Sequence, residues 1–137
     1  MRTELEVVFS TSPQSLRSQG LSSAQIAQAI DDFCIILDAM LDSPTAQFAM
    51  PALADKVLHW ILDSPELTAQ IEALFGPGAK ARHDPEAWGT EKYAEGWKRT
   101  VAAFAARGIY LSSDPAATRT DGREGFVCAF DMITRIN

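Results

Sequence analysis

The sequence predicts a helix-dominated α+β fold, in which about four helices pack with a small antiparallel sheet of N- and C-terminal strands. Apolar residues recur at intervals of three and four through the middle of the chain, whereas β-branched and aromatic residues gather near both ends. The composition, with 47% hydrophobic and 22% charged residues, is typical of a globular protein. An all-α fold is the alternative. The length of 137 residues predicts a single domain over residues 1–137.

The first ordered segment is expected at Thr3–Phe9 (TELEVVF), where polarity alternates and β-branched residues occur. This pattern predicts a strand, followed by a loop over Ser10–Gly20.

The clearest predicted helix runs from about Ser23 to Asp42. Ser22 or Ser23 can cap its first turn by accepting from a backbone N–H, and Pro44 helps to stop it. Its expected buried face carries Ile26, Ile30, Phe33, Leu37 and Leu41.

Two shorter helices are predicted next. One begins at Pro51, and the other has Ser64 as its cap and Pro65 at its first position, where the fixed φ of proline is favourable. Gly76 is placed to end the second one in a left-handed conformation. The expected buried residues are Leu53, Val57, Trp60 and Ile61 in the first and Leu67, Ile71, Leu74 and Phe75 in the second.

Gly76–His83 (GPGAKARH) is predicted to be a loop and a hinge. A fourth helix begins either at Asp84-Pro85-Glu86 or afresh at Thr90, because Gly89 interrupts the pattern. Its apolar stripe comprises Tyr93, Trp97, Val101 and Phe104, and Gly108 is a predicted end signal. The last segment, Gly125–Ile136, fits a strand or a helix, and its β-branched and aromatic residues favour the strand.

The charge distribution makes some classes of function less favourable than others. Residues 1–76 hold ten acids and three bases, whereas residues 77–137 hold eight acids and nine bases, which gives a net charge of −6. A nucleic-acid binder needs a basic footprint, so this class is disfavoured. The sequence has no apolar run long enough to span a membrane, and the acids of Met1–Glu6 do not resemble a signal peptide, so a cytoplasmic protein is expected.

Cys34 and Cys128 lie within apolar patterns and form no cluster with histidine, so no metal site and no cofactor are predicted. No nucleophile signature or phosphate-binding loop is present in the sequence either. His59 has Asp55 and Asp63 one turn away on either side, which fits a general base held by a carboxylate or a solvated histidine. His83 lies beside charged neighbours in the predicted loop.

The acidic face of the first helix is the main candidate for binding. Asp31, Asp38 and Asp42 share the face opposite the predicted core, with Ile35 between them. One apolar anchor inside a charged rim would suit a protein interface, although a solvated acidic face is the alternative. Trp88 is a second candidate, either as an exposed interface residue or as a ring buried by a turn at Gly89.

These features favour a small acidic partner-binding protein without catalytic activity. An inhibitor or immunity protein that neutralises a basic toxin or enzyme would fit, since negative charge accelerates the capture of a basic protein partner. The alternatives are a structural component or chaperone of a bacterial or phage complex, which could form a homo-oligomer, and a small enzyme with a scattered site around His59.

Overall fold

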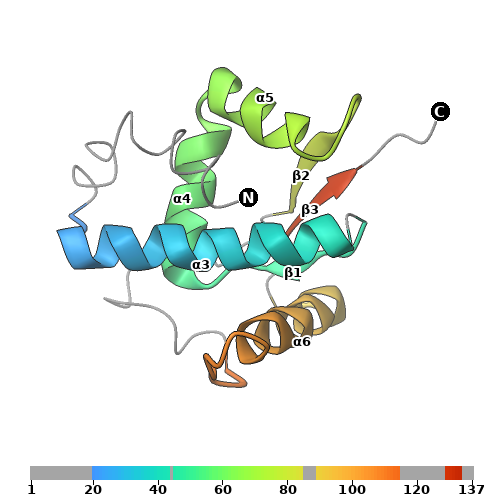
Figure 1. The fold of residues 1–137 in the computed structure, drawn as a ribbon. Coiled ribbons are helices and arrows are strands. Elements are labelled where there is room, and N and C mark those ends of the chain that lie inside the picture. The colour runs from blue at the N-terminus through green and yellow to red at the C-terminus, as the bar shows by residue number, and fades with distance from the viewer. Residues whose placement is uncertain (1–19, 44, 85–88, 115–128, 134–137) are drawn as a thin grey trace.

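The computed structural model describes residues 20–43, 45–84, 89–114 and 129–133, and its elements are labelled in Figure 1. In chain order they are α3 (Ser23–Asp42), β1 (Phe48–Ala49), α4 (Ala52–Leu62), α5 (Pro65–Ala73), β2 (Lys80–Asp84), α6 (Glu91–Ala105) and β3 (Ala129–Ile133). The helix-dominated α+β class is therefore confirmed. The strand expected at 3–9 lies outside the described residues.

Side-chain caps explain where three of the helices begin. Ser22 Oγ accepts from the N–H of Gln25 at 3.1 Å, and Gln25 Oε1 accepts from the N–H of Ser22 at 2.9 Å, which forms a capping box before α3. Ser64 accepts from Leu67 before α5, with Pro65 as the first helical residue. Thr90 Oγ1 accepts from the N–H of Tyr93 before α6, so this helix begins after Gly89.

The long helix α3 is buried on more than one side, because it packs against both α4 and α6 (Figure 1). Every described helix contributes large, fully buried side chains, and Met50 adds one from the link between β1 and α4. These residues are Phe33, Ile36, Leu37, Met40, Met50, Leu58, Ile61, Ile71 and Phe104. The buried face that the sequence predicted for α3 was too narrow. Leu41, which was expected in the core, is 37% exposed, whereas Ile36 and Met40 are completely buried.

The three strands form one antiparallel sheet in the order β1-β3-β2. Phe48 pairs with Phe130 at one edge of β3, and His83 pairs with Phe130 at the other. The strand β3 lies within the segment for which the sequence left strand and helix open. Neither β1 nor β2 was predicted, and the expected loop at Gly76–His83 is wrong for its second half, because Lys80–Asp84 forms β2.

Helix α6 covers the outer edge of β1 and supplies donors to its carbonyl groups. Thr100 Oγ1 donates to the carbonyl of Ala49 at 2.6 Å, and Arg99 donates to the carbonyl of Gln47 at 2.9 Å. Gly96 lets the two backbones approach, because a Cβ atom there would lie 3.2 Å from the nitrogen of Ala49. An exposed strand edge is prone to pairing with other chains, so this cover protects the sheet.

Candidate functional site

A groove lies between α3 and the turn that follows α6. Its two adjoining hollows have volumes of about 340 Å³ and about 170 Å³. We call it the acidic groove and define it by six of its residues: Asp31, Ile35, Asp38, Asp42, Arg107 and Ile109. Four of these are the residues that the sequence placed on the acidic face of the first helix, so the structure brings them to one surface feature.

The helical repeat of α3 explains the carboxylates of the acidic groove. Asp31, Asp38 and Asp42 are spaced by seven and four residues, so they follow one another along one face. The helix contains four aspartates, Asp32 included, and no lysine or arginine. Asp42 is exposed, while Asp31 and Asp38 are partly buried.

Ile35 does not serve as the exposed apolar anchor that the sequence suggested. It is 8% exposed and belongs to the hydrophobic core, so this expectation is wrong. The cause is the contact between α3 and α6, which covers a side of α3 that helical periodicity alone assigns to solvent. Ile35 instead lines the floor of the acidic groove.

Arg107 crosses the acidic groove to reach α3. Its Nη2 atom lies 2.7 Å from Oδ2 of Asp38, and the two side chains are 51% and 33% exposed. The turn after α6 positions this arginine, because Gly108 has a φ of +78° and its N–H donates to the carbonyl of Ala105. The N–H of Ile109 then donates to the carbonyl of Phe104, which closes the turn.

Two exposed apolar side chains follow directly and were not identified from the sequence. Ile109 is 42% exposed at the border of the acidic groove, and Tyr110 is 83% exposed beside it in the chain. Their position after the helix-ending Gly108 could have drawn attention to them, but exposure depends on how the turn packs. An apolar residue at the border of a charged groove is what a protein partner would contact.

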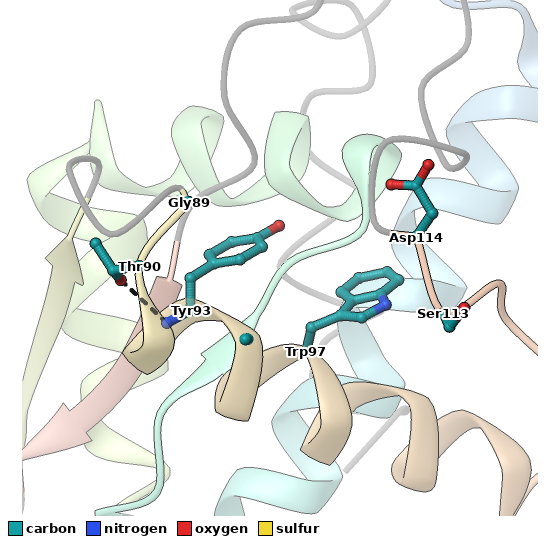
Figure 2. A pocket seen from close by; sticks show the side chains of 7 residues that line it. Gly89, Thr90, Tyr93, Trp97, Ser113 and Asp114 are labelled. Atoms are coloured by element: carbon teal, nitrogen blue, oxygen red, sulfur yellow. Dashed lines mark hydrogen bonds between the residues drawn. The ribbon is translucent and has the colours of Figure 1, made fainter.

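Trp88, the second predicted binding residue, lies outside the described residues. A separate pocket of about 290 Å³ lies at the first turns of α6. Figure 2 shows Tyr93 and Trp97 projecting from α6 to the same side, with Asp114 across from them. Both rings are nearly buried, and Trp97 Nε1 donates to the carbonyl of Ser112 at 3.1 Å. The indole of Trp97 therefore ties Ser112 to α6.

The two histidines of the chain lie against each other, although 24 positions separate them in the sequence. His59 projects from α4 and His83 from β2, and their ring centroids are 5.1 Å apart with perpendicular planes. Asp55, one turn before His59, places Oδ2 at 3.3 Å from His59 Nε2. The sequence placed Asp55 and Asp63 near His59 and assigned His83 to a loop, but it did not bring the two histidines together, because β2 was not predicted.

Local charges and burial shift two pKa values. The hydrogen bond that His59 donates to the carboxylate of Asp55 is the main cause that raises the pKa of His59, while burial acts in the opposite direction. Burial raises the pKa of Asp32 to about 6, and the neighbouring charge of Asp31 adds to this effect. Asp32 lines another hollow, with Gln28, Pro51 and Leu111 among its neighbours.

Comparisons with known proteins add no relative to this description. No family model, no curated protein and no solved structure matches the chain. Within the described residues, no helix has the length and apolar character needed to cross a membrane.

Proposed function

We propose that this protein binds a basic protein partner through the acidic groove and has no catalytic activity of its own. An inhibitor or immunity protein that neutralises a toxin or enzyme is the form of this function that we favour. The main support is that the four residues of α3 predicted to bind a partner all line the acidic groove. They are Asp31, Ile35, Asp38 and Asp42.

Charge complementarity defines the partner. The whole chain has a net charge of −6, and α3 contributes four acids and no base. A protein segment that carries lysine or arginine beside one apolar residue would match this surface. Its cations would face Asp31 and Asp42, and its apolar side chain would contact Ile109. Such charge steers encounter and raises the association rate.

We also propose that the protein acts in the cytoplasm, as expected from its sequence. An inhibitor of this kind would act on a basic enzyme or toxin that meets the protein in the same compartment.

The test is capture of a partner from native cells, at low and high salt, with identification of the retained proteins by mass spectrometry. Asp42→Lys changes an exposed carboxylate of the acidic groove, and Glu66→Lys changes an exposed carboxylate on α5 that does not line it. Both variants change the net charge equally. We expect Asp42→Lys to slow association at low salt by about threefold or more and Glu66→Lys to leave it nearly unchanged.

A single basic protein retained in stoichiometric amounts, with capture weakened by salt and by Asp42→Lys, would support the proposal. An equal effect of both variants would mean that net charge, and not the acidic groove, controls capture. If only copies of this chain are recovered, the partner-binding proposal fails in favour of self-assembly.

A structural or assembly component is the second candidate, and the exposure of Ile109 and Tyr110 favours it. Two adjacent exposed apolar residues could join copies of the chain. In that case, light scattering would show an oligomer that Tyr110→Ser dissociates. A monomer at high concentration would exclude this candidate.

A further inference from the structure

We infer that Asp55, His59 and His83 form a binding site for a divalent transition-metal ion of the Zn²⁺ class. The proposal does not depend on the acidic groove. One oxygen of Asp55 and one ring nitrogen of each histidine all lie within 4.8 Å of one another. Imidazole nitrogens and a carboxylate oxygen are ligands that Zn²⁺ accepts.

Secondary structure supplies two of the three ligands in a suitable arrangement. Asp55 and His59 are four residues apart on α4, so they project from the same face on successive turns. Their present separation of 3.3 Å between Oδ2 and Nε2 is close to that of two ligands on one tetrahedral ion, which is about 3.4 Å at the usual bond lengths. A bound ion would replace the hydrogen bond between them.

The third ligand depends on how β2 is held. The backbone of His83 pairs with that of Phe130 in β3. At the other end of the strand, Glu72 Oε2 accepts from the N–H of Ala81 at 2.8 Å, which ties β2 to α5. These contacts keep the imidazole of His83 beside His59. The three ligand atoms lie within 4.8 Å of one another, so they would have to draw closer to share one tetrahedral ion.

The surroundings favour a cation with a position open to water. Asp55 is nearly buried, whereas the side chain of His59 is 48% exposed, so solvent reaches one side of the cluster. Asp63 adds a negative charge that acts on His59, although Lys56 partly offsets it. Three protein ligands would therefore bind the ion and leave a fourth position that water can occupy.

The test uses the full chain without a histidine tag, titrated with ZnCl₂ by calorimetry and with CoCl₂ by visible absorption. We expect one ion per chain, with Co²⁺ bands of a four- or five-coordinate site and no thiolate charge-transfer band. Asp55→Asn, His59→Asn and His83→Asn should each weaken binding at least about tenfold, since even loss of an outer-shell partner has an effect of this size. Asp63→Asn, an exposed carboxylate on the same helix end, should change affinity by less than about threefold.

Nitrogen NMR of the unsubstituted protein gives an answer even if a variant fails to fold. The chain has two histidines, so the signals are simple to assign. Zn²⁺ should shift a ring nitrogen of both histidines together with a 1:1 endpoint. Absence of stoichiometric binding, a shift of one histidine alone, or a thiolate band would each overturn the proposal.

Discussion

Arg107 Nη2 lies 2.7 Å from Asp38 Oδ2, and this contact joins the turn after α6 to the middle of α3 across 69 positions of sequence. It also affects the charge of the acidic groove, because the carboxylate of Asp38 is already paired with Arg107. In the proposed function, a basic partner would compete with Arg107 for Asp38.

The Arg107–Asp38 pair is expected to add little stability. Both side chains are partly solvated, and exposed ion pairs contribute about 0.5 kcal/mol to the free energy of unfolding. We expect a double-mutant cycle with Arg107→Ala and Asp38→Ala to give a coupling energy of that size. Chemical denaturation measures it, and the exposed Lys98–Glu95 pair is the control. A coupling energy above about 2 kcal/mol would show that the pair is a major contributor to the stability of the fold.

Asp32 should make the fold more stable in mild acid than at neutral pH. Its pKa rises from 3.8 to about 6 on folding, so the folded state holds the proton more tightly between these values. The stabilisation by this proton is complete below the unfolded pKa and is lost as the pH rises through 6. A pKa rise of this size corresponds to about 3 kcal/mol in the free energy of unfolding, and partial solvation of Asp32 reduces this contribution to ~1 kcal/mol.

The variant Asp32→Asn isolates this effect from the other carboxylates. We expect it to raise the free energy of unfolding at pH 7.5 by about 1 kcal/mol and to have little effect near pH 4. Urea denaturation at both pH values tests this. Identical pH profiles for the variant and the unsubstituted protein would contradict the raised pKa.

Gly96 should resist replacement although it lies inside a helix. Alanine is favoured over glycine in helices by about 1 kcal/mol, which predicts stabilisation. At this position, however, the added Cβ would lie 3.2 Å from the nitrogen of Ala49 and 3.3 Å from the carbonyl oxygen of Gln47. Both atoms belong to backbone, so the close packing of α6 on β1 must loosen, which costs about 1–3 kcal/mol.

We therefore expect Gly96→Ala to lower the melting temperature by a few degrees, as measured by circular dichroism. Ala102→Gly, at an exposed position of the same helix, reports the helix propensity without the contact. A higher melting temperature for Gly96→Ala would mean that β1 moves away at no cost.

Much of the helical structure could be predicted because its signals are local. Ser64 followed by Pro65 marks the start of α5, and the spacing of Tyr93, Trp97 and Phe104 marks the buried face of α6. The strands were harder. Lys80–Asp84 is short and polar, and its partner β3 lies about fifty positions later, so pairing and not propensity makes it a strand.

The features of the candidate sites likewise divide into those set by local sequence and those set by tertiary packing. The sequence by itself determined the helices, the acidic face of α3 and the position of His59 one turn from both Asp55 and Asp63, because each depends on residues within a few turns of one chain segment. Only the tertiary structure decided that Ile35 is buried, that Arg107 reaches Asp38 and that His83 meets His59. These relationships arise where α3 packs on α6 and where β2 lies beside α4, and no local periodicity encodes the packing of distant segments.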